Sequence, residues 1–285
     1  MKKIMMAMAA ALMLLTACDK GETTLTVETT PPDSMKTKEI IFTFGSYSQS
    51  SMTRASLTDA QMTDLWLFDY LGDELVQTIH QTSDMEAFGA LSVNSEYGHH
   101  HFYFVASRGK EPGIDGTTVT WAKPSDTFWQ KLDLDIQPTT SGSQQVSLVR
   151  LVTKLKIAVT DEIPTNMKTL IVTPATWNNG IDYTNGSPVP EDQGTPHAVT
   201  IPDSYIGTKN LVMSIFGFCG SDEFQTDVAV TANDGDSQPI ASITLPSVPF
   251  RRNRVTSYSG SLFGQTRAFD ISMDDEWEDD YVRSW

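Results

Sequence analysis

One short run, KEIIFTF at residues 38–44, shows the pattern that decides the fold. Its apolar residues Ile40, Phe42 and Phe44 would share one face of a β-strand, because successive side chains point to opposite faces. Similar runs recur along the chain, and the gaps between them are rich in Asn, Asp, Gly and Pro. Many short strands with turns about every 8–12 residues predict an all-β protein built from β-sandwiches.

The segments that follow this run extend the same pattern. DLWLFDY at residues 64–70 and ELVQTI at residues 74–79 flank a Gly-Asp turn, which predicts a hairpin. Two segments have helical character instead, namely residues 56–65, which begin with a capping serine, and residues 124–132. The polar, turn-rich stretch PTTSGSQQ predicts a domain boundary. We therefore expect an N-terminal β-sandwich over residues 37–143 and a C-terminal one, with an acidic tail, over residues 144–285.

The N-terminus has the pattern of a bacterial lipoprotein signal. Two lysines precede an apolar run over residues 4–15, which is too short to span a bilayer as a mature helix, and LTAC then ends at Cys18. Resemblance to the lipoprotein class implies removal of residues 1–17 and attachment of lipid to Cys18. The alternative is an ordinary signal peptide followed by a chance cysteine. Residues 18–36, rich in Thr, Asp, Glu and Pro, are predicted to be a linker.

Charge and cysteine content exclude several classes of function. The formal net charge of −16 becomes −18 once the two leader lysines are removed. Such an acidic protein is poorly suited to nucleic acid or to anionic lipid surfaces, so no nucleic-acid partner is predicted. The sequence has two cysteines. With Cys18 acylated, Cys219 has no partner in the chain, which excludes an intramolecular disulfide and a cysteine-based zinc site.

No catalytic motif is evident in the sequence, so we expect neither an enzyme nor a cofactor. His99, His100 and His101 are predicted to form a loop that enters the strand FYFV. Successive side chains of a strand face opposite sides and would not converge on one metal, so no metal site is predicted. The acidic tail MDDEWEDDY has two interpretations, a solvated acidic face or a weak site for divalent cations.

One loop has the composition of a sugar-binding site. TWNNGIDYTNG at residues 176–186 combines Trp177 and Tyr183 with amides and a carboxylate. Aromatic faces stack on the C–H faces of sugar rings, and the flanking polar groups bind hydroxyls, so glycan contact by these two residues is one interpretation. The Asn-Gly pairs in the same loop are equally typical of plain turns.

The order of several motifs resembles the fimbrillin superfamily, the subunits of type V pili in Gram-negative bacteria. After the lipoprotein signal and the first hairpin come SLVRLVTKLKIAV at residues 147–159, VPFRRNRVTSYSGSLF at residues 248–263 and FDISMDDEW at residues 269–277. Anchor-type lipoprotein fimbrial subunits are especially similar. The resemblance implies two tandem β-sandwiches of the Greek-key, transthyretin-like type, and export to the outer membrane as a surface lipoprotein. It also implies strand exchange with other fimbrial subunits, and adhesion to a host or bacterial surface receptor.

The resemblance gives Arg54 two possible roles. In stalk subunits of the superfamily, an Arg-specific protease cuts the loop after the first strand, and a strand from a neighbouring subunit fills the groove. Arg54 lies at the matching position, so KEIIFTF would be the exchanged strand, with Ile40, Phe42 and Phe44 in its core. Alternatively, Arg54 is an uncut loop residue, as in an anchor subunit that keeps its lipid. The functional prediction is a fimbrial structural subunit, and the alternative is a surface glycan-binding lipoprotein.

Overall fold

A computed structural model describes residues 36–44, 62–109, 111–189, 194–264 and 268–274. Strands dominate these residues, and the one helical segment among them is the 3-10 turn Asp203–Tyr205. The predicted all-β fold of β-sandwich type is therefore confirmed. Among the same residues, no helix has the length and apolar content needed to cross a membrane. Cys18, Arg54, the signal sequence and most of the linker and acidic tail lie outside the described residues.

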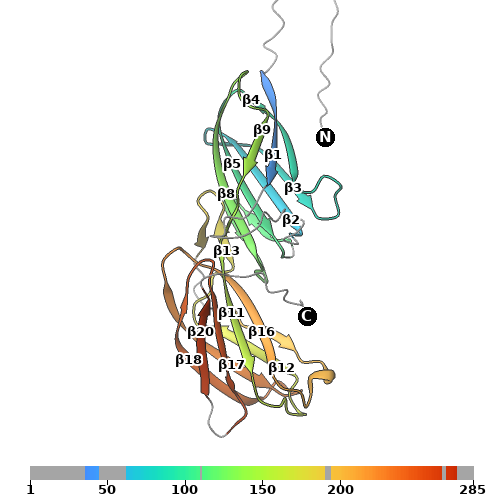
Figure 1. Cartoon of the computed structure of the whole chain (residues 1–285), viewed down its shortest axis with the longest axis vertical. Helices are drawn as coiled ribbons and strands as arrows, with labels where there is room; N and C mark the ends of the chain where they lie inside the picture. Colours follow the sequence, from blue (N-terminus) through green and yellow to red (C-terminus); the bar gives the residue numbers. More distant parts are fainter. Residues whose placement is uncertain (1–35, 45–61, 110, 190–193, 265–267, 275–285) are drawn as a thin grey trace, which may run out of the picture. The chain divides into compact units, whose positions relative to one another are not determined.

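Two sheets enclose the core of the first half of the chain (Figure 1). The smaller sheet has the order β4-β1-β9 and consists of β1 (Thr37–Phe44), β4 (Ala90–Glu96) and β9 (Ser143–Val146). The larger has the order β10-β8-β5-β2-β3 and consists of β2 (Asp64–Leu71), β3 (Glu74–Thr82), β5 (Gly98–Ser107), β8 (Thr127–Ile136) and β10 (Val149–Arg150). The predicted hairpin is confirmed, because β2 and β3 pair across a turn in which Gly72 has a φ of 59°.

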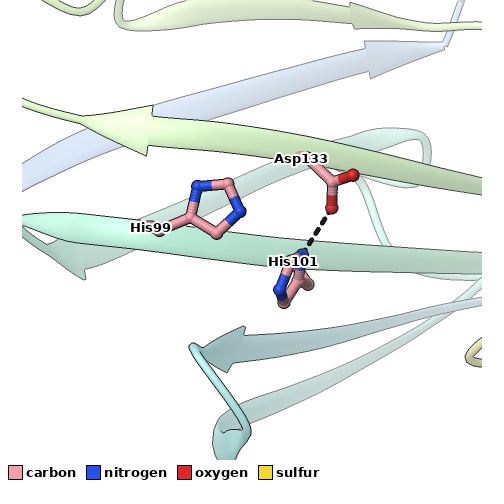
Figure 2. A group of neighbouring side chains, drawn as sticks. All are labelled: His99, His101 and Asp133. Carbon is pink, nitrogen blue, oxygen red and sulfur yellow. Dashed lines mark hydrogen bonds and ion pairs between the residues drawn. The ribbon is translucent and has the colours of Figure 1, made fainter.

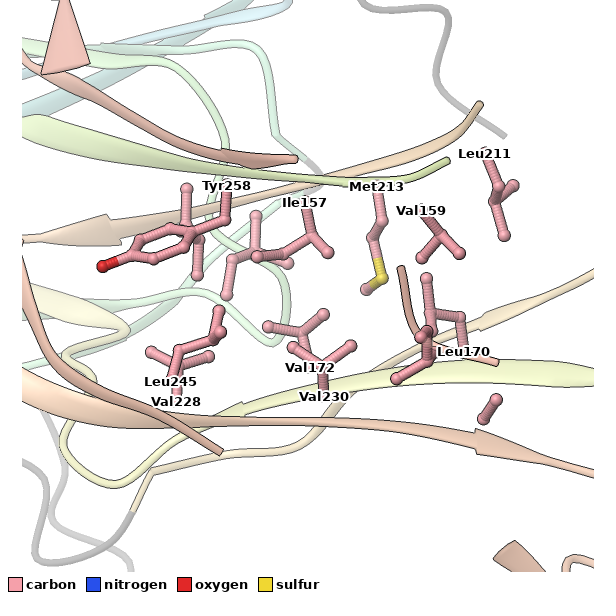
Figure 3. Close-up of a cluster of buried hydrophobic side chains, with 14 of the residues drawn as sticks. Ile157, Val159, Leu170, Val172, Leu211, Met213, Val228, Val230, Leu245 and Tyr258 are labelled. Atoms are coloured by element: carbon pink, nitrogen blue, oxygen red, sulfur yellow. The ribbon is translucent and has the colours of Figure 1, made fainter. Parts of the chain in front are cut away.

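A second pair of sheets encloses the largest apolar core. One sheet has the order β16-β11-β19-β20, and the other has the order β15-β12-β17-β18. Their strands are β11 (Val152–Val159), β12 (Thr169–Pro174), β15 (His197–Thr200), β16 (Leu211–Phe218), β17 (Phe224–Asn233), β18 (Pro239–Phe250), β19 (Val255–Ser261) and β20 (Ala268–Asp274). Alternate residues of β12 and β17, and of β11 from Leu155 onward, are buried between the two sheets, as Figure 3 shows for Ile157, Val172 and Val230.

A fifth, small sheet combines segments from both halves of the sequence. Its order is β14-β13-β7-β6, and it consists of β6 (Gly113–Asp115), β7 (Thr118–Thr120), β13 (Gly180–Asp182) and β14 (Ser187–Val189). The central pairing is between β7 and β13, where Val119 lies opposite Ile181. Both of these side chains belong to a third apolar cluster that also contains residues of β2, β5, β11 and β19. The two halves are therefore joined by a shared core as well as by the chain itself.

Two sequence-based expectations differ from the observed strands. The expected domain boundary between residues 143 and 144 falls inside β9, and both β9 and β10 pair with strands of the first two sheets. The polar stretch there is an edge strand, which needs only one apolar face. The helix predicted over residues 124–132 is wrong, because residues 127–132 lie in β8, which pairs with β5 along its whole length. In the other helical candidate, residues 64 and 65 begin β2 and residues 56–61 are outside the described residues.

Candidate functional site

β1 is the central strand of the three-stranded sheet, and its two partners meet only through it. It pairs antiparallel with β4 from Thr37 to Thr43, and parallel with β9 from Ile41 to Phe44. In the part of the chain that the structure describes, β4 and β9 have no other strand partner in that sheet. Removing β1 would therefore leave both neighbours with unpaired backbone groups.

The inner face of β1 consists of the three apolar residues singled out in the sequence. Ile40 and Phe42 are fully buried, whereas Phe44 is partly buried at the end of the strand. The ring of Phe42 packs 4.8 Å from that of Phe102 and 5.1 Å from that of Phe104, measured between centroids. Burying an aliphatic or aromatic side chain of this size contributes about 1.5–3 kcal/mol. This face therefore supplies most of the side-chain free energy that holds β1 in place.

The outer face of β1 makes few and mostly polar contacts. Ile41 is 40% exposed. The hydroxyl of Ser92 donates to the Glu39 carboxylate at 2.7 Å. Lys38, which precedes Ile40 on the inner face, donates from its ammonium to the Pro138 carbonyl at 2.7 Å at the start of the strand. The backbone amide of Ile41 donates to the Gly142 carbonyl at 2.8 Å. A strand held by its backbone and by one apolar face is the geometry of β-augmentation, in which another strand of similar pattern can take its place.

The expected glycan contacts are wrong, because both aromatic side chains are core residues. Trp177 and Tyr183 are each only 1% exposed, so neither offers a face to a sugar ring. The indole N–H of Trp177 donates to the Phe216 carbonyl at 3.0 Å. The ring of Tyr183 stacks on Phe68 with centroids 3.8 Å apart, and its hydroxyl lies 2.8 Å from that of Tyr70. Burial, followed by this hydrogen bond, raises the pKa of Tyr183 far above its ordinary value.

The plain-turn interpretation fits the end of this loop. Residues 183–186 connect β13 and β14, and Gly186 has a φ of 69° that favours glycine. The side chain of Asp182 accepts hydrogen bonds from the backbone amide and the hydroxyl of Thr184, at 2.9 and 2.7 Å. This is the ordinary use of an Asx residue in a turn.

The three consecutive histidines lie within β5, so the prediction of a loop at this point is wrong. As expected for a strand, they alternate between its faces. His100 is fully buried, with its Nδ1 at 2.7 Å from a carboxylate oxygen of Asp69 and its Nε2 at 2.9 Å from the Glu96 carbonyl. Desolvation lowers the pKa of His100, but these acceptors outweigh it and the net shift is upward.

His99 and His101 share the opposite face of β5, where they meet the carboxylates of β8 (Figure 2). Nδ1 of His99 lies 2.6 Å from Asp135, and Nδ1 of His101 lies 2.5 Å from Asp133. The sequence contained the signal for this cluster, because alternate histidines at 99 and 101 and alternate aspartates at 133 and 135 match across an antiparallel pair.

The motifs that carry the family resemblance have structural roles at the connection between the two halves. Arg150, from the motif at residues 147–159, donates from Nε and one terminal nitrogen to Asp126, at 2.7 and 3.0 Å. Its other terminal nitrogen donates to the Asn253 side chain, 3.0 Å away, in the motif at residues 248–263. Both side chains of the Arg150–Asp126 pair are 3% exposed. Arg150 therefore connects the first of these motifs with the second across the two halves.

Comparison with protein families assigns most of the chain. The model of a family of unknown function, DUF6562, matches residues 115–284, which is more than half of the sequence. The chain belongs to this family. In this DUF6562 member the match begins at the last residue of β6 and includes the second pair of sheets, the other three strands of the small sheet and the Arg150 motif. No curated protein matches the sequence.

Solved structures share the fold of this DUF6562 member at low sequence identity. A "putative adhesin" from Bacteroides thetaiotaomicron is 11% identical with a TM-score of 0.53, covering 86% of this chain and 98% of that one. A "putative cell adhesion protein" from Bacteroides ovatus is 12% identical with a TM-score of 0.52, and the match covers 87% of this chain and 100% of that one. A structure described as "putative polysaccharide binding proteins" from B. thetaiotaomicron is 10% identical with a TM-score of 0.52, and the match covers 84% of this chain and 96% of that one. The fold that the resemblance to the fimbrillin superfamily implied is thus shared with structures named as an adhesin and a cell adhesion protein.

Proposed function

We propose that this chain is a cell-surface structural subunit of a type V fimbrium that contributes to adhesion. In this proposal it is anchored to the outer membrane by lipid on Cys18 and assembles with other fimbrial subunits through exchange of β1. The observation that carries the proposal is the place of β1, a buried strand on which the pairing of both β4 and β9 depends. A structural role without catalysis is part of the proposal.

The free energy gained when β1 packs and pairs in its groove supports strand exchange as the mode of assembly. An empty groove would expose the apolar side chains around Phe42 and the unpaired edges of β4 and β9. A replacement strand would satisfy both, through backbone hydrogen bonds for affinity and through apolar side chains at the positions of Ile40 and Phe42 for specificity. An incoming strand with polar residues at those two positions would leave polar groups buried without partners.

Anchoring and cleavage define two mutually exclusive states. Arg54 follows β1 in the sequence, and Cys18 precedes it, so cutting after Arg54 separates the lipid and β1 from the rest of the chain. Lipid on Cys18 holds the uncut protein to the membrane, since each buried methylene contributes about 0.8 kcal/mol. An anchor subunit would keep β1, whereas a stalk subunit would release it.

The first test is the N-terminal residue of the protein recovered from cells. Acylated Cys18 identifies an anchored subunit, and Ala55 identifies a cleaved one. Cys18→Ala should release the protein from the membrane fraction or leave it unprocessed. If Cys18→Ala still fractionates with the outer membrane, the anchoring part of the proposal is wrong.

The second test measures exchange directly. Protein nicked after Arg54 is mixed with the intact chain in mild denaturant, and oligomers that resist dilution into fresh denaturant are measured by size-exclusion chromatography. Phe42→Ala should speed the loss of β1 from the nicked protein, whereas Ile41→Ala on the exposed face of the same strand should not. If nicked protein keeps β1 and stays monomeric even with Phe42→Ala, exchange is excluded.

Glycan binding is the less well supported function. One of the compared structures is named for polysaccharide binding, but at 10% identity the likeness describes the fold alone. The aromatic residues that suggested a sugar site in this chain are buried. We therefore keep adhesion through fimbrial assembly as the proposed function.

A further inference from the structure

The exposed face of the β5–β8 pair brings together four side chains that can bind a metal ion. In the antiparallel register, His99 lies opposite Asp135 and His101 lies opposite Asp133. All four occupy the same face because residues two apart on a strand point the same way, while His100 points into the core. Figure 2 shows the rings of His99 and His101 and the carboxylate of Asp133 directed toward a common space.

The distances suit coordination after small side-chain rotations. One ligand atom from each of His99, His101 and Asp133 lies within 4.8 Å of the other two. In a tetrahedral shell with bonds of about 2.0–2.1 Å, ligand atoms are about 3.4 Å apart. The widest pair would therefore approach by at most about 1.4 Å. His101 and Asp133, which are hydrogen-bonded 2.5 Å apart, would instead have to give up that bond and separate to about the spacing of the shell. Rotation about side-chain bonds can supply such a movement. The backbone need not move, and the continuous ladder between β5 and β8 holds it in place.

The surroundings of His99 match a common feature of metal sites. Its Nδ1 is hydrogen-bonded to Asp135 at 2.6 Å, which leaves Nε2 as the ligand atom. Figure 2 shows the ring nitrogen that is farther from the strand turned toward Asp133 and His101. A carboxylate that binds the second nitrogen of a ligating histidine fixes the tautomer and the ring orientation. Asp135 is therefore a positioning residue for His99.

The cluster is open to water, and one cation already competes for it. The side chains of His99, His101 and Asp133 are 53%, 24% and 48% exposed. Water can therefore reach the ion and fill the remaining position of the shell. The ammonium of Lys131 lies 3.0 Å from the Asp133 oxygen that also binds His101. A metal ion would have to displace this lysine, which should reduce the affinity of the site.

We propose that His99, His101 and Asp133 form a binding site for a divalent transition-metal ion of the zinc class, with Asp135 orienting His99. Two imidazole nitrogens favour Zn²⁺, Ni²⁺ or Cu²⁺ over Mg²⁺ or Ca²⁺, which prefer oxygen ligands. Binding at this face goes beyond the proposed function, since it involves neither β1 nor Cys18.

The test is titration of the full chain, made without a histidine tag, with zinc chloride in a calorimeter. His99→Gln and His101→Gln should each weaken zinc binding by more than tenfold, and Asp135→Asn should weaken it by about tenfold through the loss of orientation. Lys131→Gln should tighten binding, because it frees Asp133 and keeps every ligand. A gain of affinity in this variant cannot be an effect of misfolding.

The matched control is His80→Gln, which removes a histidine from the same pair of sheets outside the cluster. It should leave zinc affinity unchanged, and cobalt chloride should give the absorption of a tetrahedral site with this control but not with His101→Gln. If His99→Gln and His101→Gln bind zinc as tightly as His80→Gln, or if no zinc binds the wild-type chain at millimolar concentration, the proposed site does not exist.

Discussion

Residues of the same type behave differently here according to the groups that face them. His100 is fully buried, yet its hydrogen bonds to Asp69 and to the Glu96 carbonyl raise its pKa despite desolvation. His197 in β15 is partly buried, and its Nε2 has no hydrogen-bond partner among the described residues. Desolvation, aided by the charge of Lys123, lowers the pKa of His197 to about 4. His197 should therefore lower the stability of the fold as the pH falls, whereas the stabilising contribution of His100 should be lost as the pH rises.

His197 should make the protein sensitive to mild acid. The unfolded chain takes up a proton at this histidine below about pH 6.5, whereas the folded chain does so only near pH 4, so stability falls between these values. The loss should reach up to about 3 kcal/mol, at 1.36 kcal/mol for each unit of pKa shift. Urea unfolding of wild type and His197→Gln at pH 7, 6, 5 and 4 measures it. Equal acid losses in the two proteins would show that His197 is not responsible.

His100 should have the opposite pH dependence. Because its pKa is raised in the folded state, its contribution is fully present below about pH 6.5 and is lost as pH rises through the folded value. His100→Gln should therefore destabilise the protein more at pH 6 than at pH 9. His99→Gln, on the exposed face of the same strand, is the matched control. A destabilisation by His100→Gln that does not change with pH would contradict the charged His100–Asp69 pair.

Trp177 and Tyr183 mark a limit of inference from single residues. An aromatic side chain among amides suits a sugar site and a packed turn equally well, because both need a flat apolar face beside hydrogen-bonding groups. What distinguishes them is burial, which depends on Phe68 and Phe216 from strands distant in the sequence. No local pattern contains that information.

At the scale of elements, alternation of apolar residues was the reliable signal. It correctly placed the inner face of β1, and the Gly-Asp turn correctly placed the β2–β3 hairpin, since both signals lie in residues close in sequence. Alternation did not predict a strand over residues 127–132, because β8 is stabilised there by its pairing with β5, about 30 residues earlier. The polar stretch at β9 was similarly misleading, because an edge strand on a small sheet resembles a linker in composition.

The inner and outer faces of β1 should respond differently to truncation. Phe42→Ala should lower the free energy of unfolding by about 3–5 kcal/mol, because it leaves a cavity beside Phe102 and Phe104. Ile41→Ala should cost less than about 1 kcal/mol, since its side chain is largely outside the core. Urea unfolding monitored by tryptophan fluorescence provides both values. Equal losses in the two variants would mean that β1 is not packed as described.

At the scale of the whole molecule, the two halves share polar and apolar contacts. Arg150 and Asp126 form a buried pair that also contacts Asn253. The third apolar cluster combines residues of the β10-β8-β5-β2-β3 sheet, the β16-β11-β19-β20 sheet and the small sheet. The sequence indicated two sandwiches but did not show that the small sheet, with β7 and β13, would join them. Each of its strands is only three residues long, and such short runs have no detectable period.

Removal of Arg150 should weaken the connection between the halves. Arg150→Ala leaves the buried Asp126 carboxylate without its main partner, which should cost about 3–5 kcal/mol. Arg150→Lys should restore little, because an ammonium cannot reproduce the forked contact to Asp126 together with the bond to Asn253.

The control for this prediction is Lys168→Ala, which removes an exposed pair with Asp203 and should cost at most about 1 kcal/mol. Scanning calorimetry of the three variants measures the losses. It also shows whether Arg150→Ala separates one thermal transition into two. A loss from Arg150→Ala as small as that from Lys168→Ala would contradict a structural role for the buried pair.

The position of β1 also sets an order in time. β1 precedes its partners in the chain. The parallel pairing of Ile41 with Ser143 can form only after a further 102 residues (143 minus 41) have been synthesised. At a synthesis rate of about 5–20 residues per second, that interval is roughly 5–20 s. In its first part, before β4 (Ala90–Glu96) and β5 (Gly98–Ser107) have been made, the apolar residues Ile40 and Phe42 have no sheet to cover them. The strand that completes the small sheet is thus the first to be made and among the last to be fully paired, so the nascent chain passes through a period in which its groove and its own strand are still separate.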